Sequence, residues 1–312
     1  DSDGHTLGGP MVFLEKGLSQ LGMAPLGKVF GYTYAVLIIL ASFGGGNLFQ
    51  GNQTFQLIAS QAFDQPEQAT MQFKLVVGII LAVFVGLVII GGIKKIGAVT
   101  SKLVPAMCIF YSSVCLVIIF SNFSEVPQMF TKIISEAFHG SAMFGGFIGV
   151  LIQGMKRAAF SNEAGLGSAA IAHAAAKTDE PIREGAVAML GPFIDTIVVC
   201  TMTALALLIT ESHLADKVEG VYMTAHAFKT LHPQLPLLLT VAVIIFAYST
   251  MISWSYYGEK AVEYLFGRKA VPGYRIVFSI LVALGPILKF ENIINFSDMS
   301  LFALAFPNII GM

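Results

Sequence analysis

The chain has 312 residues, of which 55% are hydrophobic and 12% are charged, and its formal net charge is −1. Soluble domains usually carry about 25% charged residues, so this composition excludes an ordinary soluble domain. The sequence contains no basic run of the kind that suits nucleic acid, so no nucleic-acid partner is expected.

Long apolar segments are the decisive feature of the sequence. Residues 75–93 and 103–123 contain no charged side chain, and about 20 apolar residues span a bilayer as an α-helix. The pattern predicts an all-α polytopic membrane protein with about eight transmembrane helices. These spans are expected at residues 29–63, 74–93, 103–123, 143–177, 186–210, 234–260, 273–288 and 293–312.

The loops between the predicted spans differ in charge. Lys and Arg are more frequent on one side, and cytoplasmic loops usually carry this excess. Residues 1–28 are therefore predicted to be cytoplasmic, and the loops at 124–142 and 211–233 are predicted to lie outside. Within the second outer loop, residues 219–230 are expected to form a short amphipathic helix.

The first predicted span carries a polar helix face. Asn47, Gln50, Gly51 and Thr54 follow i, i+3, i+4, i+7 spacing. One interpretation is a cavity wall whose amides bind a small polar ligand. The other is hydrogen bonding between helices, with glycine permitting close packing. The spacing leaves both interpretations open.

The fourth predicted span contains KRAAFSNEAGLGSA at residues 156–169. The Ser-Asn-Glu sequence at 161–163 is typical of a helix start, and Gly165 and Gly167 disfavour a continuous helix. We therefore predict a discontinuous helix whose backbone unwinds at or near 158–166. Unwound backbone at membrane depth lines cavities in transporters, and the alternative is a kinked structural helix.

The fifth predicted span contains a carboxylate, Asp195, close to the middle of the membrane. An ionisable side chain at this depth is a candidate functional group. Its charge needs a partner, and Lys156 and Arg157 are the nearest candidates by membrane depth. The alternative is a structural ion pair that positions the broken helix.

The sixth predicted span includes YSTMISWSYYG at residues 248–258. Ser249 and Thr250 are neighbouring hydroxyls, and hard cations such as Na⁺ prefer oxygen ligands. Trp254, the only tryptophan in the chain, lies one turn further on. The alternative is that the hydroxyls bond to carbonyls of their own helix, and spacing alone does not decide.

Several of these motifs together resemble one family, the sodium:alanine/glycine symporters of the amino acid–polyamine–organocation superfamily. They are GGPMVFLEKGL, FGGGNLFQGN, KRAAFSNEAGLGSA, LGPFIDTIVVCT and YSTMISWSYYGEKAVEYLFG, in collinear order over nearly the whole chain. The resemblance implies a LeuT-type fold of two inverted repeats, present here in part. In that family two helices precede the GGPM segment, so the eight spans would correspond to the third to tenth helices. Residues 1–312 are thus expected to be a single transmembrane transporter domain, incomplete at both ends.

The resemblance also implies roles for individual residues. The amino acid would contact Gln50, Phe160, Ser161, Asn162, Thr250 and Trp254, with Trp254 limiting the size of its side chain. Na⁺ would bind Ser249 and Thr250. Lys156, Arg157, Glu163 and Asp195 would be structural or coupling charges, with Glu163 tying the helix break to Lys156, Arg157 or a neighbouring helix.

The implied activity is symport of a small neutral amino acid, alanine or glycine, with Na⁺ across the plasma membrane by alternating access. The expected partners are this amino acid, Na⁺ as coupling ion and the lipid bilayer, with no cofactor. One alternative is proton coupling through Glu163 or Asp195, and another is a structural or channel-like membrane subunit. An enzyme is not expected, because the sequence contains no nucleophile–base pair, metal-ligand set or phosphate-binding loop.

Overall fold

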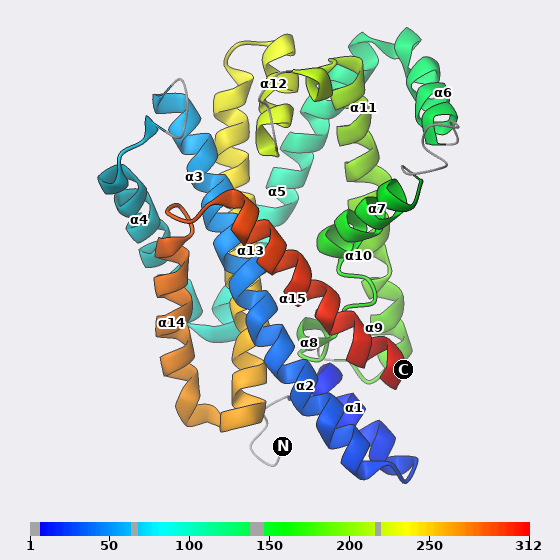
Figure 1. The fold of residues 1–312 in the computed structure, drawn as a ribbon, viewed down its shortest axis with the longest axis vertical. Coiled ribbons are helices and arrows are strands. Elements are labelled where there is room, and N and C mark those ends of the chain that lie inside the picture. Colours follow the sequence, from blue (N-terminus) through cyan, green and yellow to red (C-terminus); the bar gives the residue numbers. More distant parts are fainter. Residues whose placement is uncertain (1–6, 64–67, 138–146, 177, 216–219) are drawn as a thin grey trace.

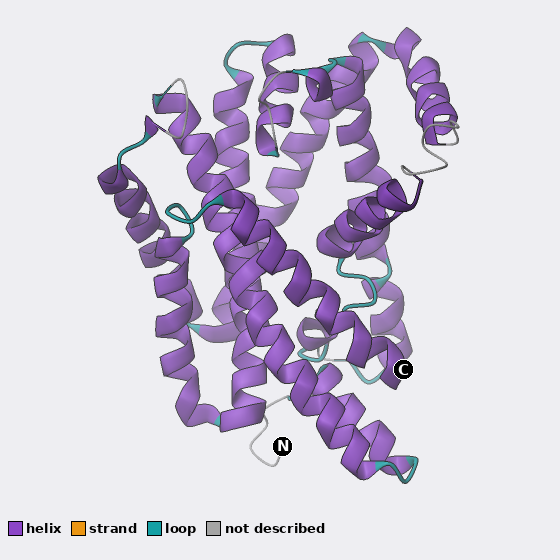
Figure 2. Ribbon diagram, viewed as in Figure 1, coloured by secondary structure: helices purple, strands orange, loops and turns teal. Residues whose placement is uncertain are grey.

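The computed structural model describes residues 7–63, 68–137, 147–176, 178–215 and 220–312. Every regular element in this part of the chain is a helix (Figure 2). The prediction of an all-α polytopic membrane protein is confirmed. Six described segments are long and apolar enough to cross a membrane: Ala24–Ala62, Met71–Ile89, Lys95–Ser121, Pro181–Ile209, Leu235–Phe266 and Phe290–Gly311.

The first part of the chain forms a short helix and a long central one. The elements are α1 (Pro10–Gln20), α2 (Ala24–Phe43), the π-helix η1 (Gly44–Leu48) and α3 (Phe49–Ala62). The glycine run at 44–46 does not stop the helix, because η1 continues α2 directly into α3. The predicted first span is therefore one continuous helical rod.

The middle of the chain contains two more long helices and several short ones. They are α4 (Met71–Ile89), α5 (Gly92–Ser121), η3 (Phe123–Glu125), α6 (Val126–Ala137), α7 (Phe147–Asn162), α8 (Ala169–His173), α9 (Pro181–Ala188), α10 (Leu190–Pro192) and the π-helix η5 (Phe193–Cys200). The predicted fourth span is thus divided between α7 and α8.

The last part of the chain consists of α11 (Thr201–Ile209), η6 (Ser212–Leu214), α12 (Val221–Leu231), α13 (Leu235–Phe266), η7 (Arg268–Ala270), α14 (Val271–Leu284) and α15 (Phe290–Gly311). The short helix predicted at 219–230 is confirmed by α12. The predicted seventh span corresponds to α14, which is shorter than the six long apolar segments.

The α2–η1–α3 rod is the centre of the bundle. α1, α13 and α15 pack against it, and α15 crosses α2 obliquely (Figure 1). α4 and α14 pack against each other at one side, and α5 packs against α13 and α11 at another. The main apolar core includes Tyr34, Ile38, Met251 and Phe278, each fully buried. Large apolar side chains on the outside, such as Ile109, are those that lipid covers in a membrane protein.

Candidate functional site

The fourth predicted span is broken, as expected, but the break begins later than predicted. α7 remains helical through Asn162, and α8 begins only at Ala169. Residues 163–168 between them are not helical. The Ser-Asn-Glu sequence therefore ends a helix, and its interpretation as a helix start was wrong. The predicted unwinding at 158–166 overlaps the observed break only from residue 163 onwards.

Left-handed backbone produces this break. Gly165 and Gly167 have φ of 79° and 81°, and Glu163 has φ of 57°. Glycine adopts such angles readily, since it has no Cβ, whereas a glutamate does so rarely. A Cβ on Gly167 would lie 2.5 Å from Pro10 Cγ and 2.6 Å from Asn308 Oδ1. Both the backbone angle and the lack of space therefore require glycine at this position.

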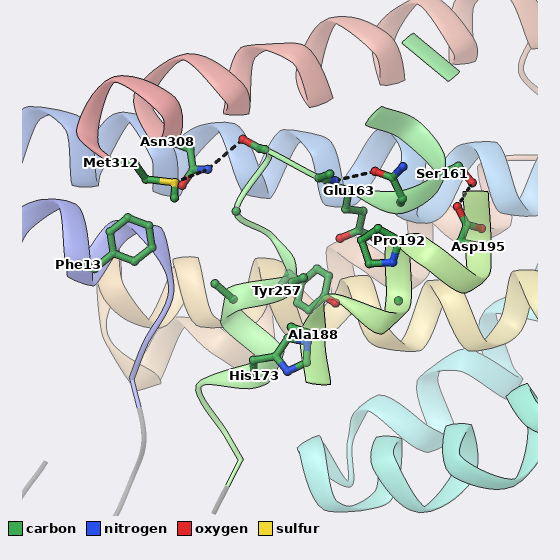
Figure 3. A pocket seen from close by; sticks show the side chains of 17 residues that line it. Phe13, Ser161, Glu163, His173, Ala188, Pro192, Asp195, Tyr257, Asn308 and Met312 are labelled. Atoms are coloured by element: carbon green, nitrogen blue, oxygen red, sulfur yellow. Dashed lines mark hydrogen bonds between the residues drawn. The ribbon is translucent and has the colours of Figure 1, made fainter. Parts of the chain in front are cut away.

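Other helices hold the unwound backbone in place. The Tyr34 hydroxyl of α2 donates a hydrogen bond to the Leu166 carbonyl at 2.9 Å. The Asn308 amide of α15 donates to the Gly165 carbonyl, also at 2.9 Å (Figure 3). Free carbonyl groups at membrane depth are costly unless they are bonded within the protein. The two long-range donors therefore stabilise a break that would otherwise expose its backbone.

Glu163 lies at the start of the break and reaches both the end of the break and a neighbouring helix. The Ser168 hydroxyl donates a 2.5 Å hydrogen bond to the carboxylate, which also lies close to the Trp254 indole of α13. Glu163 thus links the first and last residues of the break. Of its three predicted partners, the neighbouring helix is the one it meets, whereas Lys156 and Arg157 form no salt bridge with Glu163 in the described part of the chain.

Asp195 lies in the π-helix η5, directly beside the end of α7. The Ser161 hydroxyl donates a 2.5 Å hydrogen bond to its carboxylate (Figure 3). The neighbouring Thr196 hydroxyl donates at 3.3 Å and accepts a 2.8 Å hydrogen bond from the Asn162 amide. The end of α7 is therefore joined to η5 by hydroxyl and amide groups.

The predicted pairing of Asp195 with Lys156 or Arg157 was also wrong. Arg157 instead forms hydrogen bonds of 2.6 and 2.5 Å to both carboxylate oxygens of Asp298 on α15. Its guanidinium also lies 5.4 Å from the centre of the Phe160 ring. Sequence reasoning missed Asp298, although it is a carboxylate within the eighth predicted span and could have been found in the way Asp195 was.

Three of the expected substrate residues meet at η1, and one of them, Trp254, also lies close to Glu163 of the break. Phe160 packs against Gly45, and its ring meets that of Phe49 edge-on, with centroids 4.9 Å apart. The Gln50 amide donates to the Gly45 carbonyl at 3.0 Å. The Trp254 side chain packs so tightly on Gly46 that a Cβ there would lie 2.4 Å from Trp254 Cβ.

The two hydroxyls expected to bind Na⁺ lie on α13, four and five residues before Trp254. Ser249 is buried and donates to the Phe246 carbonyl of its own helix at 2.8 Å. This is the structural role considered as the alternative. This hydrogen bond uses the hydroxyl hydrogen, so the lone pairs of the hydroxyl oxygen remain able to coordinate a cation. Thr250 is half-buried.

A cavity of about 560 Å³ opens beside the break (Figure 3). Among the expected site residues, Ser161, Asn162, Glu163 and Asp195 line it, whereas Gln50, Phe160, Ser249, Thr250 and Trp254 do not. The full lining is Phe13, Ser161, Asn162, Glu163, Ala164, Gly165, Gly167, Ala169, Ala170, His173, Ala188, Gly191, Pro192, Asp195, Tyr257, Asn308 and Met312. The expected residues thus form two groups, one at the cavity and one around η1 and α13, linked through α7.

Comparison with known proteins gives a consistent result. The sequence model of the sodium:alanine symporter family matches residues 1–312. The chain is 44% identical to the sodium/alanine symporter AgcS of Methanococcus maripaludis, covering 100% of this chain and 67% of that protein. It is 38% identical to a transporter of Haemophilus influenzae, with coverage of 100% and 67%. It is 32% identical to the amino-acid carrier protein AlsT of Bacillus subtilis, with coverage of 97% and 62%.

The chain spans about two thirds of the length of these relatives. The match of the whole chain to the family model and the identity to AgcS agree with the motifs. The chain belongs to the sodium:alanine symporter family.

Proposed function

We propose that this chain takes part in sodium-coupled symport of a small neutral amino acid, alanine or glycine, across the plasma membrane by alternating access. Family membership supports sodium-coupled amino-acid symport in general. The observation that carries the proposal is the unwound segment 163–168, which lines a cavity. Hydrogen bonds from Tyr34 and Asn308 hold this segment in place. Broken helices of this kind form substrate and ion sites in transporters.

The amino acid would bind where the end of α7 meets the cavity. Ser161 and Asn162 offer hydroxyl and amide groups to its charged ends, and Phe160 would close the site on the side of η1. Gln50, Thr250 and Trp254 would complete it. The η1 group and the cavity group adjoin, because Phe160 and Ser161 are adjacent and belong to different groups, and because Trp254 lies close to Glu163.

Na⁺ would be the driving co-substrate, bound by oxygens of Ser249 and Thr250. At a membrane potential of about 100 mV, one Na⁺ gains about 2.3 kcal/mol, to which its concentration gradient adds. Binding and release of this ion would bias the position of α13, which carries Trp254 against η1. The chain's own part in the mechanism is thus to couple an oxygen-lined ion site to a broken helix.

A second candidate is proton coupling through Asp195. Its carboxylate has hydroxyl partners, and in the described part of the chain it has no cationic one. A carboxylate in that setting at membrane depth can bind a proton or a metal cation to balance its charge. Proton coupling predicts uptake that follows a pH gradient without Na⁺ and that is lost in Asp195→Asn.

The test is uptake of radiolabelled alanine by the full-length protein in liposomes, with and without a Na⁺ gradient. Ser249→Ala should raise the Na⁺ concentration for half-maximal uptake about tenfold, corresponding to about 1.4 kcal/mol. Ser255→Ala is the matched control, because Ser255 is also buried on α13 and also donates to the carbonyl three residues earlier.

The outcomes separate the hypotheses. Alanine uptake that is indifferent to Na⁺ would exclude sodium coupling. Equal Na⁺ dependence in Ser249→Ala and Ser255→Ala would remove Ser249 from the ion site and leave its bond to the Phe246 carbonyl as its only role. Uptake that is absent for every amino acid tested would favour a structural or channel-like subunit.

A further inference from the structure

α6 is the most amphipathic of the described helices, and its apolar side is uncovered. Phe130, Ile133 and Ile134 are 43%, 42% and 60% exposed. With Ala137 they follow i, i+3, i+4, i+7 spacing, so they form one stripe along the helix. The side chains of Thr131 and Ser135 point to another side. A helix divided in this way is stable when something apolar covers its stripe.

The stripe lies beside the part of α6 that rests on the bundle and shares Val126 with it at one edge. Val126, Met129 and Lys132 are the half-buried positions of α6, and α6 packs beside α11. No residue of α6 is buried (Figure 1 shows the helix at the edge of the bundle). The contact with α11 therefore leaves Phe130, Ile133 and Ile134 partly exposed, and Ile134 most of all.

The stripe continues a surface that faces lipid. α5 contains one of the segments long and apolar enough to cross a membrane, and its exposed side chains include Ile109, Leu116, Val117 and Phe120. Phe120 near its end is 66% exposed and stacks on Phe123 of η3, with ring centroids 6.4 Å apart. Phe123 is itself 64% exposed, and α6 begins three residues later. Exposed apolar side chains therefore lie on both sides of the short connection between the membrane span and α6.

We propose that α6 contacts the bilayer at the edge of the bundle, where it runs down alongside the long helices (Figure 1), with Phe130, Ile133 and Ile134 against the acyl chains near the lipid headgroups. Lipid is the occupant because the helix follows directly on a membrane span whose exposed apolar side chains extend to Phe123.

A second tryptophan reports the position of α6. The chain has one tryptophan, Trp254, which is buried on α13 and gives a constant background. Phe130→Trp places an indole in the stripe, and Ser135→Trp places one on the polar side as the matched control. Each variant of the full chain is reconstituted into liposomes that contain lipids brominated near the headgroup end of the acyl chains, and the parent protein's fluorescence is subtracted.

The expected result is strong quenching and a blue-shifted emission for Phe130→Trp, with no quenching by aqueous iodide. Ser135→Trp should show the reverse. Equal quenching of both by iodide would overturn the proposal, because α6 would then stand in water. A blue-shifted Phe130→Trp that neither iodide nor brominated lipid quenches would also overturn it, and would assign the stripe to a protein partner or a second copy of the chain.

Discussion

Two glycine-rich stretches lie within predicted membrane helices, and they behave differently. Residues 44–48 remain helical as η1, with no positive φ among them. Residues 163–168 leave the helix, with left-handed backbone at Glu163, Gly165 and Gly167. Composition does not explain the difference, because both stretches combine glycine with a polar side chain in an apolar setting. The explanation lies in what surrounds each stretch.

At η1 the glycines allow close approach of side chains. The Trp254 side chain occupies the space that a Cβ on Gly46 would need, and the Phe296 ring lies 3.1 Å from the Cβ position of Gly44. At the break the glycines allow backbone angles, and donors from α2 and α15 bond to the freed carbonyls. Glycine therefore has a packing role in one stretch and a conformational role in the other.

The largest expected effect is that of Gly167→Ala at the break. An alanine there adopts a left-handed angle, at a cost of about 1–2 kcal/mol, and its Cβ collides with Pro10 and Asn308. Overpacking of this kind costs about 1–3 kcal/mol more. We expect a markedly lower unfolding temperature in detergent, measured by circular dichroism, and a loss of alanine uptake in liposomes.

Gly165→Ala is the matched control for this substitution. Gly165 has nearly the same φ, but the nearest atom to its Cβ position is Ile309 Cδ1 at 3.8 Å. It should therefore show only the angular cost. Equal losses in Gly165→Ala and Gly167→Ala would mean that packing against Pro10 and Asn308 adds nothing to the requirement for glycine.

The next largest effect is expected at η1. Gly46→Ala leaves the backbone angles unchanged but places a Cβ 2.4 Å from Trp254 Cβ, so it should destabilise the protein by about 1–3 kcal/mol through overpacking. Because the colliding atoms are Cβ, Cγ and Cδ2 of Trp254, Gly46→Ala should cost less stability in a Trp254→Gly background than in the parent chain. The readout is the unfolding temperature of the single and double variants, since Trp254 also belongs to the proposed substrate site.

The comparison with Gly167 depends on how much of each loss a neighbouring substitution recovers. The strain at Gly167 lies partly in its own backbone and partly against Pro10, so Asn308→Ala should recover only part of the stability that Gly167→Ala loses. If Gly46→Ala costs as much in the Trp254→Gly background as in the parent chain, the packing role assigned to the η1 glycines is wrong.

The local sequence predicted that the fourth span is broken, but not that the Ser-Asn-Glu sequence ends one helix rather than beginning the next. Serine, asparagine and glutamate suit a helix start, because their side chains accept hydrogen bonds from free backbone N–H groups. The side-chain oxygen of Asn162 does accept such a bond, from the Ala164 N–H, but it does so where α7 ends rather than where a helix begins. The left-handed φ of Glu163 ends the helix, and residue preferences alone do not predict that angle.

The ion-pair partners could not be predicted, because they depend on how distant helices pack. Arg157 and Asp298 are separated by 141 positions and meet only because α15 crosses near α7. Membrane depth selected Asp195 as the nearest carboxylate, but depth fixes one coordinate of three. The all-helical architecture was more accessible, since long apolar segments have few ways to satisfy their backbone in a bilayer.

The smallest expected effect concerns the hydrogen bond that holds the break from α2. Tyr34→Phe removes the donor to the Leu166 carbonyl while keeping the buried ring, and the carbonyl left behind should cost about 1–3 kcal/mol. Tyr274→Phe is the matched control near η1. Its hydroxyl lies 3.0 Å from that of Ser42, which keeps its own bond to the Ile39 carbonyl, so less is lost.

The two tyrosine variants sharpen the comparison because they separate stability from function. If the break needs external donors and η1 does not, Tyr34→Phe should lower alanine uptake more than its loss of unfolding temperature explains, while Tyr274→Phe should lower both slightly or not at all. Equal effects of the two variants on uptake would show that the Leu166 carbonyl tolerates the loss of its donor. The unwound segment would then be held by its glycine geometry and by Asn308, rather than by α2.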